Sequence, residues 1–325
     1  MNTISVIIPA ESSLASVPII DYLNKMDYPQ ENIEIILTIG NWPSAQRNQA
    51  AGVAKGDILY FFNRNTQLQP DLFNKMVSII NREEKVAGVG GADITPQSNS
   101  YMQHLFGYAM GSYFAHWKMR ARYIQVGTER VASENELLLS NMAIKRAIFL
   151  EAGGFHEELY PNEENELINR ISRMGYKFIY SPDIRISRDR RSDIFKFIRQ
   201  FFCYGQGRFN QIKIEGLLGN LQFLIPLFFL FYFISLFFAD NARLLFIPLI
   251  IYIFLAVIDS GYLSLKNRKN LIILPVIYMV MHFSYGCGML AGICKNITKR
   301  KKPLNSRVNH KIVYIKKITC RGYLK

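Results

Sequence analysis

Residues 43–65 are the most informative stretch for the fold, and they read PSAQRNQAAGVAKGDILYFFNRN. Its first part, residues 46–55, is rich in alanine and predicts a helix. Its second part, residues 58–62, is a short run of aliphatic and aromatic side chains, typical of a strand buried on both faces. Polar side chains, Asn63-Arg64-Asn65, follow the run. A helix that leads into a buried strand is the repeating element of α/β proteins.

The same pattern continues on both sides of this stretch. Residues 5–9 and 33–39 are further aliphatic runs, closed by a proline and by Gly40. Residues 14–26 have apolar positions at helical spacing, and residues 70–80 predict another helix that begins at a proline. Alternating strands and helices imply right-handed crossovers and a mainly parallel, Rossmann-like sheet. The predicted fold class is therefore α/β.

Three loops follow the carboxyl ends of the predicted strands. They contain Pro9-Ala10-Glu11, Ile39-Gly40-Asn41 and Asn63-Arg64-Asn65. Ligands of open parallel sheets bind beyond the carboxyl ends of the strands. The sequence therefore predicts a binding crevice where these loops meet.

The C-terminal third is apolar. Residues 217–239, 244–265 and 271–294 are each long enough to cross a hydrocarbon core of about 30 Å. The basic loop 266–269 is expected on the cytoplasmic side. Three full spans would place the basic tail outside, so we expect the third segment, which contains Pro275, to be re-entrant or interfacial. No signal peptide precedes the first strand, so the soluble part is expected in the cytoplasm.

Two ionisable residues, Asp259 and His282, lie inside these apolar segments. Such residues indicate a functional site by default, and lining a path for a polyprenyl-phosphate acceptor is one interpretation. The other interpretation places Asp259 near the end of its helix, with its carboxylate reaching out to water.

The net charge of +14 is concentrated in the tail, since residues 295–325 carry eleven Lys and Arg and no acidic residue. A basic run directly after apolar segments is typical of a contact with anionic lipids at the cytoplasmic surface. No zinc-binding spacing or RNA-binding motif accompanies it, so nucleic acid is not an expected partner.

Four motifs in order resemble family 2 glycosyltransferases of the GT-A fold. These are SVIIPA at residues 5–10, PSAQRNQAAGVAKGDILYFFNRN, SNMAIKRAIFLEAGGFHEELYPNEENELINRISRMGYKFIYSPDI at residues 140–184, and RQFFCYGQGR at residues 199–208. The resemblance implies a nucleotide-sugar-binding GT-A domain over 1–190, an interfacial Arg/Gln helix over 191–215, about three membrane helices over 216–294 and a basic cytoplasmic tail over 295–325.

The resemblance also implies roles for particular residues. The acidic ED motif of the family falls on Glu163-Glu164, with Glu164 as the base of an inverting transfer and Glu163 beside it. The expected contacts to the nucleotide sugar are Pro9, Ala10, Glu11, Gly40, Arg47, Asn63, Asn65 and Asp93. Arg199, Gln200 and Arg208 are expected to bind the diphosphate.

One motif departs from the family. The metal-binding DXD position reads Asn63-Arg64-Asn65, which leaves Asn65 as a weak ligand for Mg²⁺ or Mn²⁺. Three explanations stay open. The enzyme works without a metal, through Arg64, Arg199 and Arg208; another carboxylate such as Asp93 holds the metal; or the chain is an inactive homologue.

The sequence thus predicts a glycosyltransferase of the hexosyltransferase type. Its donor is expected to be a UDP-sugar, and its acceptor a lipid-linked (polyprenyl-phosphate) glycan or a polysaccharide of exopolysaccharide or other cell-surface synthesis. Its expected place is a bacterial-type plasma membrane, with several membrane passes and contacts to lipids and other glycan-synthesis proteins. The alternative is an inactive membrane subunit that binds a partner in a glycan-synthesis complex.

Overall fold

The computed structural model describes residues 1–10, 19–62, 66–236, 238, 243–298 and 311–316. The chain forms two compact units. The first comprises Met1–Pro96, Ala121–Asp189 and Lys302–Lys325; the second comprises Gln97–Arg120 and Arg190–Lys301. The four-part division drawn from the sequence stays a prediction, and the insertion 97–120 and the tail are grouped differently here.

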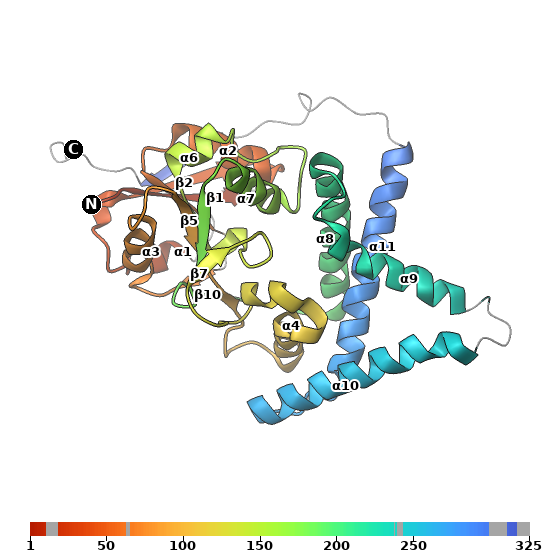
Figure 1. Ribbon diagram of the computed structural model, residues 1–325. Coiled ribbons are helices and arrows are strands. Elements are labelled where there is room, and N and C mark those ends of the chain that lie inside the picture. The colour runs from red at the N-terminus through yellow and green to blue at the C-terminus, as the bar shows by residue number, and fades with distance from the viewer. Residues whose placement is uncertain (11–18, 63–65, 237, 239–242, 299–310, 317–325) are drawn as a thin grey trace. The chain divides into compact units, whose positions relative to one another are not determined.

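An eight-stranded sheet organises the first unit, with strand order β11-β2-β1-β3-β8-β5-β9-β7 (Figure 1). Its strands are β1 Ile4–Ala10, β2 Ile33–Ile39, β3 Ile58–Phe61, β5 Val86–Gly90, β7 Arg130–Ala132, β8 Met142–Lys145, β9 Lys177–Tyr180 and β11 Lys311–Lys316. The predicted parallel pairing holds for β2-β1-β3, whereas β8 runs antiparallel to both β3 and β5. The α/β fold class is confirmed, with a mixed sheet.

Helices cover both faces of this sheet. Helices α1 Ile19–Leu23 and α3 Leu72–Ile80 pack on one face, and α2 Pro43–Val53, α6 Arg146–Glu151 and α7 Glu163–Arg173 pack on the other (Figure 1). The pleat sends successive side chains to opposite layers. In β1, for example, Val6 joins the α1–α3 layer and Ile7 joins the α2–α6–α7 layer. Both layers are buried, which explains the continuous apolar strands.

The first unit also contains a small three-stranded sheet. It consists of β4 Thr66–Leu68, β10 Ile186–Arg188 and β6 Asp93–Ile94, in the order β4-β10-β6. Thr66, the residue after the Asn63-Arg64-Asn65 segment, pairs with Arg188, and Asp93 pairs with Ile186. The sheet therefore brings three segments that are distant in the chain to one edge of the first unit.

The strand β11 comes from the basic tail and was not predicted. It pairs antiparallel with β2 and closes that edge of the large sheet. Its six residues read KIVYIK, and the strand was missed because basic residues dominate the sequence around it. An exposed edge strand invites pairing with other chains, so β11 protects β2.

The second unit is helical. It contains α4 Tyr101–Gly111, α5 Tyr113–His116, α8 Ile194–Glu215, α9 Ile225–Leu236, α10 Ile247–Asn267 and α11 Leu274–Thr298. Helix α11 packs against α8, α9 and α10. Glycines make the α8–α11 contact possible, since a Cβ at Gly205 would lie 2.1 Å from the Tyr285 carbonyl oxygen and one at Gly288 would lie 2.0 Å from that of Phe202. Small residues allow such close helix packing in membrane proteins.

By length and composition, two helical stretches of the described chain could cross a membrane: Arg243–Asn267 and Leu274–Asn296. The apolar stretch Leu221–Leu236 is shorter. The third segment was expected to be re-entrant or interfacial. A re-entrant form does not agree with α11, which is one unbroken helix of 25 residues, and an interfacial position stays a prediction. Pro275 lies in the first turn of α11, where the missing N–H of proline costs no hydrogen bond.

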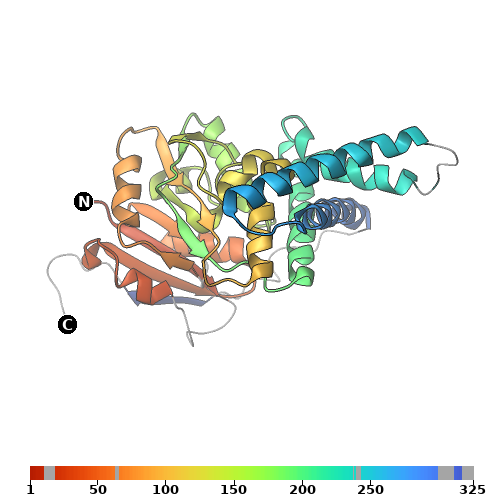
Figure 2. The ribbon, with the colours of Figure 1, turned by 90° about the horizontal axis from the view of Figure 1, so that it is seen from below.

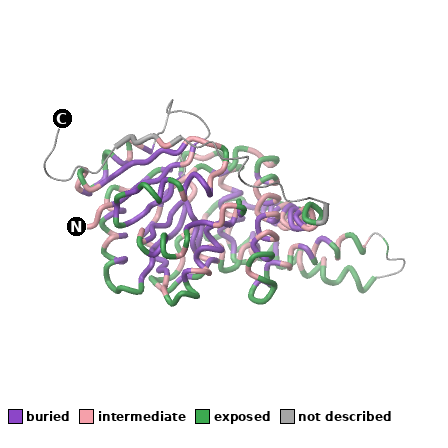
Figure 3. Tube along the Cα trace, turned by 90° about the horizontal axis from the view of Figure 1, so that it is seen from above, coloured by how far each residue is buried: buried purple, intermediate pink, exposed green. Residues whose placement is uncertain are grey.

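Exposure differs sharply between the strands of the first unit and two helices of the second. The strands β1, β2, β3, β5, β8 and β9 are mostly buried, whereas much of α9 and α10 is exposed (Figure 3). The exposed side chains of α10 are large and apolar, for example Ile250 at 63% and Phe254 at 62% exposure. An apolar helix that exposes such side chains is suited to contact lipid.

Candidate active site

Helix α2 holds the chain segment that leads into α7. The Ser44 hydroxyl donates to the Leu159 carbonyl at 2.9 Å. The Asn48 side chain donates to the Phe155 carbonyl and accepts from its N–H, each at 2.8 Å, and also donates to the Glu157 carboxylate at 3.1 Å. An amide that bonds both groups of one residue acts as a piece of backbone. The approach to α7 is therefore fixed.

The acidic pair lies at the start of α7. Asn162 precedes it with a φ of 83°, a left-handed conformation that asparagine tolerates better than most residues. Glu163 and Glu164 follow as the first two helical residues and are 2% and 8% exposed. The N-terminus of a helix carries positive partial charge, which favours acidic side chains there. The local geometry therefore places two buried carboxyl groups side by side.

Glu163 is held by a cation. Its Oε1 accepts a hydrogen bond from Nη1 of Arg47 at 2.7 Å, and both side chains are buried. Burial raises the pKa of Glu163 to about 7; Arg47 opposes this shift and the neighbouring Glu164 adds to it. The structure thus brings together Arg47, expected near the nucleotide, and the first residue of the acidic pair.

The other polar side chains in this turn are also engaged. Glu166 forms a two-point pair with Arg170, at 2.8 Å for each bond. The side-chain amide oxygen of Asn165 accepts from Arg122 at 2.6 Å. Among the residues that the structure describes, none forms a hydrogen bond or ion pair with the Glu164 carboxylate. Glu164 is therefore the acidic group of this turn that is available to a substrate.

The strand ends of the predicted crevice lie together. The Gly40 N–H donates to the Ala10 carbonyl at 2.8 Å, and Pro9 pairs with Thr38 in the sheet. Gln46 of α2 joins both ends, since its amide donates to the Ala10 carbonyl at 3.1 Å and to the Thr38 carbonyl at 2.7 Å. Pro9, Ala10 and Gly40 thus meet at one edge, as expected for parallel strands.

The remaining donor-side predictions divide into two groups. Glu11 and the Asn63-Arg64-Asn65 segment lie outside the described residues. Asp93 is fully buried, and its Oδ2 accepts from Arg188 at 2.8 Å and from the Ser140 hydroxyl at 3.2 Å. Asp93 is therefore held beside a cation. It lies on β6, one edge strand of the small sheet, whereas Thr66 lies on β4, the other edge strand.

The described part of the site does not have the donor set of a divalent cation. The described chain contains no group of three or more His, Cys, Asp or Glu side chains placed to hold a metal ion. Asp93 is already neutralised by Arg188, and the DXD position offers two amides around an arginine. Hard cations such as Mg²⁺ and Mn²⁺ bind through carboxylates. These residues do not fit a resident metal, and no chemical step is derived through one.

The three α8 residues expected at the diphosphate lie in the second unit and face different directions. Arg199 is exposed, whereas Arg208 is 1% exposed and its guanidinium lies 3.5 Å from the ring centre of Phe223. Nine residues apart on a helix, the two arginines point in opposite directions, about 14 Å apart along the axis. Gln200 donates to the Tyr204 hydroxyl at 3.0 Å. They do not converge on one ligand, and their role stays a prediction.

Four side chains that hydrogen-bond to site residues or to the segments around them were not predicted from the sequence: Ser44, Gln46, Arg122 and Ser140. Each acts on a partner that is distant in the chain, except that Gln46 also bonds Thr38. The signal that could have indicated Ser44 and Gln46 is their place between two predicted site residues, Gly40 and Arg47. No local pattern indicates Arg122 or Ser140.

Comparison with known proteins places this geometry in context. The family model described as glycosyl transferase family group 2 matches residues 60–283. A Methanococcus voltae protein, named dolichyl N-acetyl-alpha-D-glucosaminyl phosphate 3-beta-D-2,3-diacetamido-2,3-dideoxy-beta-D-glucuronosyltransferase, is 25% identical over 347 residues, covering 91% of this chain and 98% of its own. The mannosyltransferase PcManGT from Pyrobaculum calidifontis, solved with GDP-Man and Mn²⁺, superposes with a TM-score of 0.52 at 14% identity, covering 92% of this chain and 88% of its own. That likeness shows a shared fold.

Proposed function

Because the chain belongs to glycosyl transferase family group 2, we propose that this glycosyltransferase transfers a sugar from a nucleotide-sugar donor to a glycan carried on a lipid phosphate. The family and the shared fold support the reaction. The name of the Methanococcus voltae relative, which acts on a dolichyl-linked sugar phosphate, supports the acceptor. A polysaccharide acceptor without lipid is the less supported form of the same reaction.

The chemistry rests on Glu164. Its carboxylate takes the proton of the acceptor hydroxyl while the oxygen bonds to the anomeric carbon of the donor sugar. The bond from that carbon to the diphosphate breaks, the nucleoside diphosphate leaves, and the configuration inverts. Glu163 does not compete for this task, because Arg47 holds it. Arg47 and Glu163 are positioning residues that keep the neighbouring carboxylate in place.

The donor is proposed to bind at the strand ends around Ala10 and Gly40. Asp93 is fully buried and held by Arg188 and Ser140, so it is proposed as a positioning residue for this site. A UDP-sugar is the donor that the family resemblance favours. Positive side chains must stabilise the charge of the leaving diphosphate. Arg199 and Arg208 of α8 are proposed for this role, as the family resemblance implies.

Membrane association is proposed through α10 and α11, which are long and apolar enough to cross a bilayer. A cytoplasmic catalytic unit suits a cytoplasmic pool of nucleotide sugars. Passage of several helices through a bacterial-type plasma membrane, contacts with other glycan-synthesis proteins and a role in exopolysaccharide synthesis belong to the same proposal.

The observation that carries the proposal is the Glu164 carboxylate, buried and without a partner among the described residues. The test is transfer by the full chain in detergent, with radiolabelled UDP-sugars and lipid-phosphate-linked sugar acceptors. Glu164→Gln should lose activity by about 100-fold or more with unchanged donor binding, since general bases contribute at least that much. Glu158→Gln changes an exposed carboxylate in the same loop and should leave the rate unchanged. Equal rates for the two variants would overturn the assignment, and absence of donor binding by the wild-type chain would favour an inactive subunit.

A further inference from the structure

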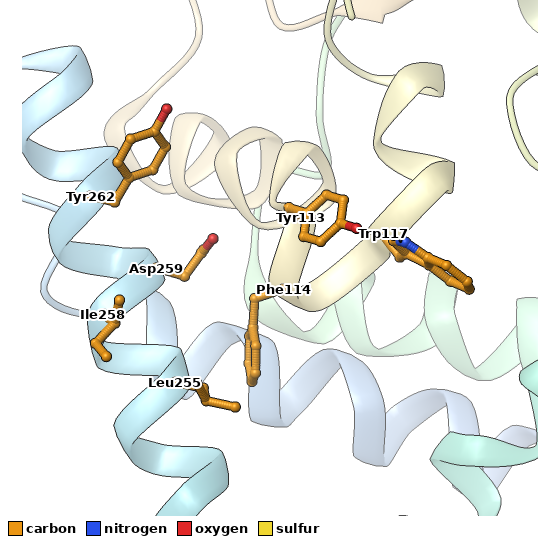
Figure 4. A pocket seen from close by; sticks show the side chains of 7 residues that line it. All are labelled: Tyr113, Phe114, Trp117, Leu255, Ile258, Asp259 and Tyr262. Atoms are coloured by element: carbon orange, nitrogen blue, oxygen red, sulfur yellow. Dashed lines mark hydrogen bonds between the residues drawn. The ribbon is translucent and has the colours of Figure 1, made fainter.

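The second unit contains an open groove between α5 and α10, with a volume of about 480 Å³ (Figure 4). Tyr113, Phe114 and Trp117 form its α5 side. Leu255, Ile258, Asp259 and Tyr262 form the other side. Their spacing of i, i+3, i+4 and i+7 places them on one face of α10. The groove is of the size that ligand sites have, and most of its lining is apolar or aromatic.

Cations surround the rim of this groove. The guanidinium of Arg120 lies 5.2 Å from the ring centre of Tyr113, and the ammonium of Lys118 lies 5.5 Å from that of Trp117. On the α10 side, the ammonium of Lys266 lies 5.8 Å from the ring centre of Tyr262. Each aromatic side chain with a polar tip that lines the groove therefore carries a cation over its ring.

These cations have N–H groups to spare. In the part of the chain that the structure describes, Lys118, Arg120 and Lys266 form no ion pair or hydrogen bond. The one carboxylate among the lining residues is committed, because Asp259 accepts from the Ser112 hydroxyl at 2.8 Å and from the Tyr278 hydroxyl at 2.5 Å. The rim is consequently positive, and the described residues supply no anionic partner for its three cations.

The walls of the groove are held in place by buried polar contacts. The Asp259 bonds tie α10 to the start of α5 and to α11. His282 of α11 adds a second tie, with one ring nitrogen 3.0 Å from the Tyr252 hydroxyl of α10 and the other 3.0 Å from the Ala115 carbonyl of α5. This answers the question raised by Asp259 and His282 in the sequence: both residues join α5, α10 and α11. The groove is therefore preformed.

Charge and surroundings indicate one occupant. Helix α10 is long and apolar enough to cross a membrane, and only 11% of its most apolar 18-residue stretch is buried. Tyr, Trp and Lys gather at the level of lipid headgroups. We propose that the groove binds the hydrocarbon chain of an isoprenoid lipid phosphate, with Lys118, Arg120 and Lys266 facing its phosphate. The identity of this lipid as the acceptor carrier rests on the proposed function, whereas the site itself rests on the contacts above.

The first test fills the groove. Leu255→Trp places a large side chain in it, and Ile253→Trp is the matched control on the opposite face of the same helix; the two residues are 45% and 44% exposed. Binding of a long-chain polyprenyl monophosphate to the full chain in nanodiscs is measured without donor. We expect Leu255→Trp to weaken binding by about tenfold, the effect of 1.4 kcal/mol, and Ile253→Trp to leave it unchanged. Equal binding by the two variants would overturn the proposal.

The second test removes the rim charge. The double variant Lys118→Gln/Arg120→Gln should lose the preference for polyprenyl monophosphate over the uncharged polyprenol, by about tenfold if the phosphate contact is worth about 1.4 kcal/mol. Arg243→Gln, an exposed cation before the start of α10, is the control and should keep the preference. Displacement by phosphatidylglycerol as effectively as by polyprenyl monophosphate would also contradict the proposal, since it would identify a site for bulk membrane lipid.

These tests separate the site from the activity. If the wild-type chain binds the polyprenyl monophosphate as expected but transfers no sugar, the proposed function fails and the lipid site stands. If transfer onto the lipid-linked acceptor is equal in wild type and Leu255→Trp, with equal binding, the site fails and the function stands.

Discussion

The acidic start of α7 and the rim of the α5–α10 groove differ in how many of their polar side chains have partners. At α7, Glu163 to Glu166 are all buried, and three of the four side chains have a defined partner. At the groove, Lys118, Arg120 and Lys266 stack on aromatic rings and have no described anionic partner. In both places the group left without a partner, Glu164 or the three cations, is the one to which we assign a ligand. Paired charge positions the chain, and unpaired charge is available to substrates.

The largest expected effect comes from breaking the pair at α7. Arg47→Gln would leave the Glu163 carboxyl buried without its cation, and breaking a buried ion pair costs about 3–5 kcal/mol. The free energy of unfolding, measured by denaturant titration at about pH 8, above the pKa of Glu163, should fall by up to that amount. The double variant Arg47→Gln/Glu163→Gln should recover part of the loss, because no charge then stays unpaired. A loss that is the same in single and double variants would show that the pair carries no special energy.

The second effect is a pH dependence of stability. The pKa of Glu163 rises from 4.5 to about 7 in the folded chain, mainly through burial. The folded state thus holds a proton that the unfolded state releases between these pH values, so the contribution of Glu163 to stability is greatest below pH 4.5 and is lost as pH rises through about 7. The total fall is on the order of 3 kcal/mol. This fall should be absent from the pH profile of Glu163→Gln, and the difference in unfolding free energy between wild type and variant should therefore change with pH. An unchanged pH profile in that variant would place the titration elsewhere.

The third effect concerns the hydrogen bonds between Asn48 of α2 and the loop before α7. Asn48→Ala removes the two bonds to the Phe155 backbone and should lower the unfolding free energy by about 2 kcal/mol. Transfer should show a lower kcat with little change in the KM for the donor, because the base is misplaced. Gln49→Ala, an exposed neighbour on the same helix, is the control. A change in donor KM alone would indicate that Asn48 contacts the nucleotide instead.

The smallest effect is expected from removal of divalent cations. The donor set around Asp93 does not fit a metal ion, since Arg188 already neutralises that carboxylate. Transfer should therefore persist, with little change in rate, after dialysis against EDTA. Loss of activity that Mn²⁺ restores would show that the Asn63-Arg64-Asn65 segment, or a residue near it, supports a metal despite its composition.

Much of the fold could be predicted because its central strands and several helices follow from local patterns of apolar and polar residues. β1, β2 and β3 were predicted to within one residue, since strands buried on both faces are continuous apolar runs. The start of α2 was placed three residues late, at Gln46, because Pro43 is an unusual helix former except in the first turn. The antiparallel β8, the tail strand β11 and the grouping of 97–120 with the C-terminal helices depend on long-range pairing, which no local pattern encodes.

The candidate site divides in the same way. The acidic pair was found through its motif, and the strand ends through the rule for parallel sheets. The partner of Glu163 was not, because Arg47 lies 116 residues earlier in the chain. The same holds for the committed carboxylate of Asp259, whose partner Ser112 is 147 residues away. Which charges are paired is a property of the fold, and it decides which carboxylate can act as a base.

The most direct test of this account is the rate of a single round of sugar transfer by Glu164→Gln and Glu163→Gln, with the donor bound to saturation. Glu164→Gln should lose about 100-fold or more in rate, since it removes the base. Glu163→Gln should lose less and keep a measurable rate, since it alters a group already held by Arg47. The reverse order, with Glu163→Gln the slower variant, would contradict the assignment of the base.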